Sequence, residues 1–276
     1  MQGRIRITNH GNRMFLLAIA WLVCVAIPFS QAASSEQPEK QDNSLKVGVS
    51  VNSPPFVYLQ GKQPVGLEPE LASELGKFLK RPVRFVEVKW IDQIPTLLEG
   101  RTDIIMSGMS ITAMREARIA FSDSYLKTGQ MAMVRREDKN RYSQGYATVL
   151  QQAPTKVIGA VKGTTGEQFV LKDLGTAKKI RLFNTSSEGI NALTATFETR
   201  RIDILIHDGP ILISELAERQ SIDLALVPSL LTEEYLAWGI RKNDPELLES
   251  VNRFLKTMKE NGRLVSIVQR WIPLTK

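Results

Sequence analysis

Residues 103–122, DIIMSGMSITAMREARIAFS, predict a buried strand, a polar turn and the start of a helix in direct succession. The first four residues form an apolar run of the strand type, and hydroxyl groups and backbone donors follow as far as Thr112. Arg115 then falls where the next helix begins. Several donors can therefore converge on one small anion, such as a carboxylate. The alternative is an ordinary strand-to-helix connection, with Ser110 or Thr112 as the N-cap and Arg115 on the surface.

Strands alternate with helices on both sides of this stretch. The hydrophobic pattern predicts strands at residues 46–51, 83–88 and 103–106 and helices at 70–79 and 91–99. After a connecting region that includes the polar segment 135–152, the order restarts with strands at 156–161, 179–183 and 202–207 and helices at 166–171 and 188–197. This order indicates two α/β units, each with a mainly parallel sheet flanked by helices. A short strand at 238–241 and an amphipathic helix at 245–259 follow.

The two units also share a short sequence. RTDIIM at residues 101–106 has its counterpart in RIDILI at residues 201–206. Ligands of such sheets bind beyond the carboxyl ends of the strands, so two of these ends can face one cleft. Arg115 lies beyond the first strand and Asp208 ends the equivalent strand. This cation and anion suit a zwitterion, whereas the alternative for Asp208 is a helix N-cap before Pro210.

The N-terminus has the three parts of a secretory signal peptide. Three arginines precede the apolar run 14–29, and Ser30-Gln31-Ala32 follows it. We expect residues 1–32 to be removed, which predicts an exported protein. A membrane anchor is one alternative, although the run is shorter than the ~20 residues of a spanning helix. A lipid on Cys24 is another. Residues 33–44 are polar and lack periodicity, as is typical of a flexible leader.

Composition argues against several classes of protein. Cys24 is the only cysteine, so the chain after residue 32 forms neither a disulfide nor a thiolate metal site. We expect no metal and no cofactor. Loss of the three leader arginines lowers the net charge from +7 to +4. Because the other Lys and Arg residues are dispersed along the chain, we expect no nucleic-acid partner.

The assembled motifs resemble those of the periplasmic solute-binding proteins that deliver polar amino acids to ABC importers, the extracellular solute-binding family 3. The resemblance covers residues 45–271 and rests on PPF at 54–56, GLEPELA at 66–72, Trp90 with Ile94, Pro95 and Leu98, residues 103–122 with Tyr125, GTTG at 163–166, residues 203–208 and residues 252–271. It implies a two-lobed, type II periplasmic-binding-protein fold, with crossover hinge strands near 129–134 and 236–241. Lobe 1 would comprise residues 45–132 and 237–276, and lobe 2 residues 133–236. The family also implies a monomer that works with an ABC permease.

The resemblance implies roles for residues on both sides of a cleft. Arg115 matches the arginine that grips the ligand's α-carboxylate, helped by Ser110 and by the backbone around Gly108. Thr164 or Thr165 matches the donor to the same carboxylate from the second lobe. Asp208 matches the acid that accepts the α-ammonium group.

Other matched positions concern the ligand's side chain. Phe56 and Trp90 stand where aromatic residues flank it, with core packing as the alternative. The positions near Ser50, Asn52 and Ser53 are neutral and polar, which argues against a cationic ligand because a buried charge needs an acidic partner. We therefore expect a neutral polar or acidic L-amino acid. A non-amino-acid anion stays open if Asp208 does not face the cleft.

We expect a binding protein and not an enzyme. The chain after residue 32 has one histidine, His207, which we expect to be an ordinary strand residue, and it contains none of the GxSxG, HExxH, P-loop or GxGxxG patterns. One alternative is a sensory protein that presents its ligand to a receptor. Another is a periplasmic dehydratase-like enzyme that uses a cleft carboxylate such as Asp208.

Overall fold

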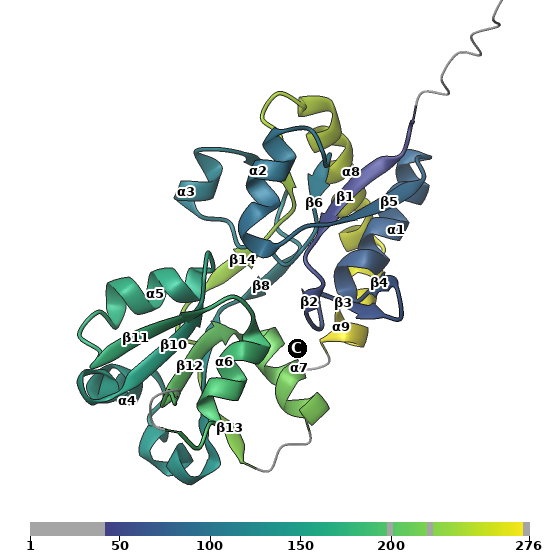
Figure 1. Cartoon of the computed structure of the whole chain (residues 1–276). Coiled ribbons are helices and arrows are strands. Elements are labelled where there is room, and N and C mark those ends of the chain that lie inside the picture. Colours follow the sequence, from purple (N-terminus) through teal and green to yellow (C-terminus); the bar gives the residue numbers. More distant parts are fainter. Residues whose placement is uncertain (1–41, 198–200, 220–222, 273–276) are drawn as a thin grey trace, which may run out of the picture. The chain divides into compact units, whose positions relative to one another are not determined.

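The first sheet of the computed structural model combines strands from both ends of the chain (Figure 1). The structure describes residues 42–197, 201–219 and 223–272. Within them, this sheet comprises β1 (Leu45–Val49), β5 (Val83–Glu87), β6 (Ile104–Ile105), β7 (Ala120–Phe121) and β15 (Gly239–Ile240). The strand order is β5-β1-β6-β15-β7, and β15 runs against its neighbours.

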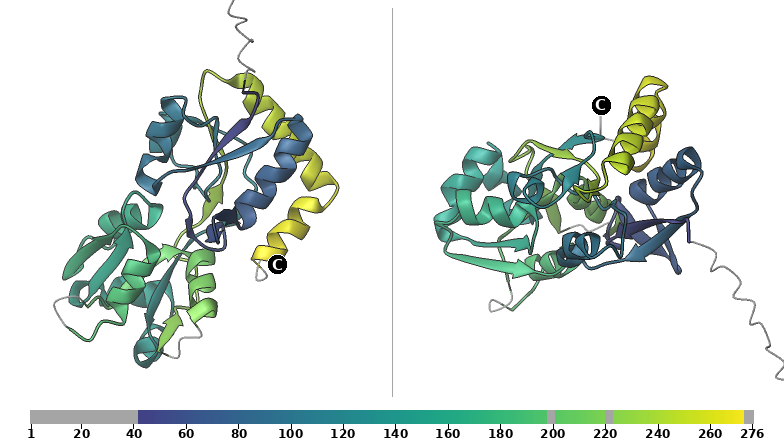
Figure 2. Two further views of the ribbon diagram at one scale, coloured as in Figure 1. Left: turned by 45° about the vertical axis from the view of Figure 1, so that its right-hand side comes forward. Right: turned by 90° about the horizontal axis from the view of Figure 1, so that it is seen from above.

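Helices pack on both faces of the first sheet. Three of them, α1 (Leu67–Leu79), α8 (Pro245–Glu260) and α9 (Arg263–Trp271), lie side by side (Figure 2). Ile104 belongs to the core cluster beneath these helices, and Ile105 to a second cluster on the opposite face. The other elements here are α2 (Gln93–Leu98), α3 (Ala113–Glu116), the 3-10 turn η1 (Trp90–Asp92) and a small sheet of β2 (Asn52–Ser53), β3 (Val57–Gln60) and β4 (Gln63–Val65).

The second sheet repeats the plan of the first. Its strands are β9 (Gln130–Arg135), β10 (Val157–Val161), β11 (Lys179–Phe183), β12 (Ile204–Asp208) and β13 (Leu224–Leu226), in the order β11-β10-β12-β9-β13. Here β9 is the reversed strand, so each sheet is mainly parallel, as the sequence predicted. The helical segments are η2 (Arg136–Tyr142), α4 (Tyr146–Gln152), η3 (Ala153–Thr155), α5 (Thr165–Asp173), α6 (Ser186–Leu193) and α7 (Gly209–Arg219).

Two antiparallel strands connect the sheets. They are β8 (Leu126–Thr128) and β14 (Glu234–Leu236). The crossover strands were expected near residues 129–134 and 236–241, but the structure places them a few residues earlier in the chain. β9 already belongs to the second sheet and β15 to the first. Only Gly129 separates β8 from β9, and only two residues separate β14 from β15, so the sequence does not mark where each connecting strand ends.

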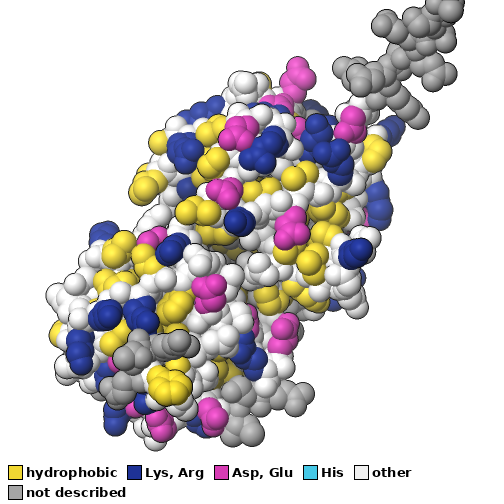
Figure 3. All heavy atoms as spheres, viewed as in Figure 1, with side chains coloured by type: hydrophobic (Ala, Val, Ile, Leu, Met, Phe, Trp, Pro, Cys, Tyr) yellow, Lys and Arg dark blue, Asp and Glu magenta, His cyan; other side chains and the backbone are white. Residues whose placement is uncertain are grey.

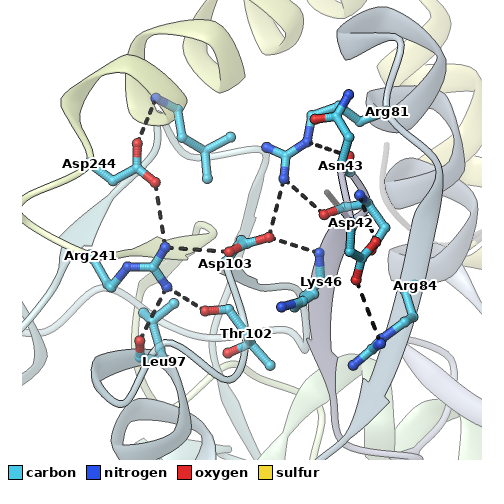
Figure 4. Close-up of polar contacts among 12 residues, drawn as sticks. Asp42, Asn43, Lys46, Arg81, Arg84, Leu97, Thr102, Asp103, Arg241 and Asp244 are labelled. Carbon is cyan, nitrogen blue, oxygen red and sulfur yellow. Dashed lines mark hydrogen bonds and ion pairs between the residues drawn. The ribbon is translucent and has the colours of Figure 1, made fainter. Parts of the chain in front are cut away.

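Asp103 fixes the start of the first sheet (Figure 4). Its Oδ2 accepts a hydrogen bond from the backbone N–H of Lys46 at 3.0 Å. Arg81 lies 3.3 Å from the same oxygen, and Arg241 lies 3.4 Å from Oδ1. One carboxylate therefore ties β1 to the segment before β6 and to the segment after β15.

Asp203 does the same for the second sheet. Its Oδ2 accepts from the backbone N–H of Val157 at 2.9 Å, and Arg135 lies 2.9 Å from Oδ1. Burial raises the pKa of Asp203, but the Val157 N–H and the Arg135 guanidinium outweigh burial and lower the pKa below its usual value. The aspartate of the repeated sequence thus has the same structural function in both units.

The N-terminal expectations fall mostly outside the described residues, which exclude the signal peptide (1–32) and most of the leader (33–44). The last leader residues are held in place: Arg81 donates to the carbonyl oxygens of Asn43 at 3.2 Å and Ser44 at 2.9 Å (Figure 4). Figure 3 shows Lys and Arg side chains interspersed with Asp and Glu over the face that it draws. This face has the mixed charge expected from the dispersed basic residues.

Candidate functional site

A cavity of about 540 Å³ is lined by loops at the carboxyl ends of strands from both sheets. Glu87, Trp90 and Gly108 line it from the side of the first sheet, and Thr164 and Asp208 line it from the side of the second. Ser50, Asn52, Ser53, Lys89, Asp92, Lys162, Asn184, Thr185 and His207 also contribute to the lining. The wall therefore carries charges of both signs among neutral polar groups.

Asp208 faces this cavity at the end of β12, and its side chain is 13% exposed. Its Oδ1 accepts from Gln130 Nε2 at 2.8 Å, and the same amide nitrogen donates to Thr165 Oγ1 at 3.0 Å. Oδ2 lies 3.3 Å from Nδ1 of the neighbouring His207. The carboxylate is held in place by Gln130 while it lines the cavity.

Arg115 is buried beside the cavity, on the other side of Trp90. Thr112 is the N-cap of α3 and accepts from the Arg115 backbone N–H, which confirms one of the two predicted caps. The guanidinium donates to the carbonyl oxygen of Ser110 at 2.7 Å and to that of Gly163 at 3.1 Å. It lies 5.3 Å from the centre of the Trp90 ring. Arg115 is thus buried, contrary to the surface alternative, and it contacts both halves of the molecule.

Two opposing effects act on the pKa of Arg115. Burial lowers the pKa of the Arg115 guanidinium, while the carboxylates of Asp208 and Glu234 raise it. Arginine stays charged at all ordinary pH values, so the site holds a fixed cation with two acidic neighbours.

Glu234 joins two of the predicted site residues. Its Oε2 accepts from Ser110 Oγ at 2.6 Å and from Thr165 Oγ1 at 2.7 Å, and its Oε1 accepts from Thr232 Oγ1 at 2.8 Å. Glu234 is not among the residues predicted from the sequence. The pair Glu233-Glu234 at the start of β14 was the available signal, and its sequence does not differ from that of a solvated acidic pair.

Glu68 lies in the core, where three donors converge on its carboxylate. Oε1 accepts from the Gly108 N–H at 2.6 Å and the Tyr125 hydroxyl at 2.5 Å, and Oε2 accepts from Trp238 Nε1 at 2.8 Å. Burial raises the pKa of Glu68 although the three hydrogen bonds oppose this, and burial together with the Glu68 charge raises the pKa of Tyr125 well above its usual value. Glu68 therefore fixes the Gly108 loop to the segments that adjoin β8 and β14.

The structure separates the predicted site residues into three places. Five of them line the cavity: Asp208, Thr164, Trp90, Gly108 and Ser53. Ser110 and Thr165 donate to Glu234, and Arg115 donates to the backbone of Ser110. Phe56 packs in the core and is 1% exposed, so it takes the core alternative and does not line the cavity.

Details of three placed residues limit what each can offer to a ligand. The Gly108 N–H is committed to Glu68, and a Cβ at Gly108, where φ is 68°, would lie 3.0 Å from the Phe56 ring. Thr164 is the N-cap of α5, and its hydroxyl donates to the Val161 carbonyl oxygen at 2.6 Å. The Thr165 hydroxyl donates to Glu234 Oε2, the oxygen that also accepts from Ser110.

Within 42–197, 201–219 and 223–272, no group of three or more His, Asp or Glu residues is arranged to hold a metal ion. No helix of that same part of the chain has the length and apolar character needed to cross a bilayer.

Comparison with known proteins gives one family. The profile of the bacterial extracellular solute-binding proteins, family 3, matches residues 45–274. The arginine-binding extracellular protein ArtP of Bacillus subtilis (strain 168) is 24% identical over 261 residues, which cover 94% of this chain and 98% of ArtP.

Two solved structures are also similar. The ancestral amino acid-binding protein AncCDT-1, described as a precursor of cyclohexadienyl dehydratase, is 32% identical with a TM-score of 0.74, over 83% of this chain and 96% of that one. A binding component of an ABC transporter from Wolinella succinogenes, complexed with lysine, is 26% identical with a TM-score of 0.76, over 84% of this chain and 97% of that one.

Proposed function

Since the chain belongs to the bacterial extracellular solute-binding proteins of family 3, we propose that it captures one L-amino acid in the 540 Å³ cavity and delivers it to an ABC permease. The observation that carries the proposal is the placement of the Asp208 carboxylate at the cavity wall, with the buried Arg115 cation behind Trp90. An amino acid carries the complementary pair of charges.

Each end of the zwitterion has its own partners in this proposal. Asp208 accepts the α-ammonium group, and Gln130 holds its carboxylate in position. Arg115, Ser110 and Thr165 bind the α-carboxylate, because a guanidinium and two hydroxyl donors suit a two-oxygen anion. Trp90, Thr164 and Ser53 line the space for the rest of the ligand, and Gly108 lines it through its backbone.

Binding proceeds by hinge closure, as is general for periplasmic binding proteins. The expected lobes are residues 45–132 with 237–276 and residues 133–236. Because β9 already belongs to the second sheet, we place the bending strands at β8 and β14. Closure excludes water and strengthens the charge pairs, and the closed form is the one that a permease recognises. The protein acts as a monomer in the periplasm after loss of residues 1–32.

The ligand's side chain is proposed to be neutral and polar or acidic, because Ser53, Asn52 and Lys162 are among the lining groups. A cationic side chain is the second class to test. Glu87 and Asp92 also line the cavity, and they supply the acidic partners that the positions Ser50, Asn52 and Ser53 lack.

No catalytic step is part of the proposal. His207 is buried in β12, 4% exposed, beside Asp208. A dehydratase would need turnover of its substrate, and a sensory protein would bind the same ligand but present it to a receptor. Turnover of the bound compound would contradict the proposal. Stimulation of a permease by the ligand-bound protein would separate transport from sensing.

Thermal unfolding of the purified protein with a panel of common amino acids and small organic acids tests the proposal, since a ligand that binds the folded state raises Tm. We expect one or a few amino acids to raise Tm. The rise should disappear in Asp208→Asn, which keeps the size of the side chain, and in Arg115→Lys, which removes the forked guanidinium. Arg118→Lys, an exposed neighbour, is the matched control and should keep the rise. The proposal would be contradicted if no amino acid raised Tm. It would also be contradicted if Tm rose only with acids that have no amino group.

A further inference from the structure

The Glu234 carboxylate already uses donors that the proposed function assigns to the ligand. Ser110 and Thr165 both donate to its Oε2, at 2.6 and 2.7 Å. Ser110 follows β6 of the first sheet, and Thr165 begins α5 beside the second sheet. One oxygen atom of an internal carboxylate therefore bridges the two halves at the position proposed for the ligand's α-carboxylate.

Arg115 supplies the positive charge for the same place. Its guanidinium donates to the carbonyl oxygen of Ser110, the residue whose hydroxyl holds Glu234. Arg115 is 7% exposed, so it needs acidic neighbours inside the protein. The acidic groups that act on it are Asp208 and Glu234. The Ser110 and Thr165 hydroxyl groups thus already hold a carboxylate, and the Arg115 cation is bonded to the backbone of Ser110 beside it.

Glu233, the residue before Glu234, shows the contacts that an exposed glutamate makes in this segment. Glu233 lies 2.9 Å from Lys127 Nζ, accepts from the Tyr235 hydroxyl at 2.8 Å and has a side chain that is 60% exposed. Glu234 is partly buried and contacts Ser110, Thr165 and Thr232 instead. Three side-chain donors converge on Glu234, which sets it apart from an ordinary rim residue.

We propose that Glu234 is an internal competitor that sets the affinity of this site. Its carboxylate occupies the Ser110 and Thr165 donors and must leave them when the α-carboxylate of a ligand binds. The inference rests on the proposed function. Each hydroxyl has one proton to donate, and two carboxylates at one site repel each other, so Glu234 and the ligand exclude one another. Glu234 therefore weakens the binding of every ligand that presents a carboxylate here.

Calorimetric titration with the amino acid found by the thermal panel gives the first test. We expect Glu234→Ala to bind it at least about tenfold more tightly than the unchanged protein, because two donors become free. Glu234→Gln keeps the size without the charge and should also bind more tightly, which covers the case in which the alanine variant does not fold. Glu233→Ala is the matched control and should leave the affinity unchanged. Equal or weaker binding by both Glu234 variants would overturn the inference.

Acetate gives a second test that needs no amino acid. It is a free carboxylate small enough to replace the Glu234 group between Ser110 and Thr165. We expect acetate, at constant ionic strength, to raise the Tm of Glu234→Ala but not that of the unchanged protein or of Glu233→Ala. No rise in Glu234→Ala beyond that of the control would overturn the inference. A panel without an amino-acid ligand would contradict the proposed function, while the acetate result would still decide whether this position binds carboxylates.

Discussion

Replacing Glu68 by Gln tests how the core holds the Gly108 loop. The Gln side chain has nearly the same shape, and its oxygen can still accept from the Gly108 N–H and the Tyr125 hydroxyl. The amide nitrogen then faces Trp238 Nε1, which donates to Glu68 Oε2 at 2.8 Å. Two donors cannot satisfy one another. Because Trp238 is fully buried, its indole N–H is left without a partner, which costs about 1–3 kcal/mol of unfolding free energy.

Urea unfolding of the purified protein measures this loss. A matched control is Glu70→Gln on the same helix: Glu70 accepts from Trp271 Nε1 at 2.7 Å but is partly exposed, so water can replace the lost bond. The control should lose less than about 1 kcal/mol. A Glu68→Gln variant as stable as the control would refute the reasoning that Trp238 depends on the carboxylate.

The stability difference between the unchanged protein and Glu68→Gln should depend on pH in a definite direction. Burial raises the pKa of Glu68 above 4.5, so the folded protein keeps a proton that the unfolded chain loses. The contribution of Glu68 to stability is therefore fully present below pH 4.5 and is lost as the pH rises through the folded-state pKa. A carboxyl oxygen accepts from Trp238 in either protonation state, whereas an amide nitrogen never does. The stability difference between the unchanged protein and Glu68→Gln should narrow from mildly acidic to neutral pH, and a difference that widens would contradict this sign.

Three other substitutions test the scaffold. Asp203→Asn should destabilise the protein at neutral pH, and this loss of unfolding free energy should fade as the pH falls below 3.8 through the lowered folded-state pKa. Urea unfolding at several pH values measures the loss, and a loss that does not change with pH would mean that the Val157 and Arg135 contacts are unimportant. Gly129→Ala places a Cβ against the Thr232 carbonyl oxygen and should lower the unfolding free energy by about 3 kcal/mol or more, measured by thermal unfolding. An unchanged Tm would show that β8 and the segment before β14 separate easily. Asp244→Ala removes the N-cap of α8, because Asp244 Oδ1 accepts from the Leu247 N–H at 3.2 Å. The variant should lose about 1 kcal/mol of unfolding free energy in urea, and a loss near zero would mean that Pro245 alone starts the helix.

The repeated plan of the fold was predictable because it depends on local patterns. The apolar runs that became β1, β5, β10 and β11 lie within a residue or two of the expected strands, and the RTDIIM and RIDILI repeat anticipated the equivalent β6 and β12. The position of Asp208 was predictable for the same reason, since a polar residue at the carboxyl end of a parallel strand lies at the ligand edge of the sheet, and Asp208 lines the cavity there.

Contacts between distant segments were not predictable in this way. Ser110 and Glu234 are 124 residues apart, and Glu68 and Trp238 are 170 residues apart. In one sequence nothing distinguishes Glu234 from its neighbour Glu233. Phe56 was equally consistent with a ligand contact and with core packing, because an aromatic residue beside a loop suits both. These choices depend on which side chains the fold brings together.

The most direct test of the central claim is a calorimetric titration of the purified protein with three related compounds: the amino acid that raises Tm most, the amine that lacks its carboxylate and the acid that lacks its amino group. The Asp208 and Arg115 arrangement predicts one bound amino acid per chain and a loss of at least about a hundredfold in affinity for each analogue, since each leaves one buried charge without its partner. An analogue that binds as tightly as the amino acid would contradict the zwitterion site.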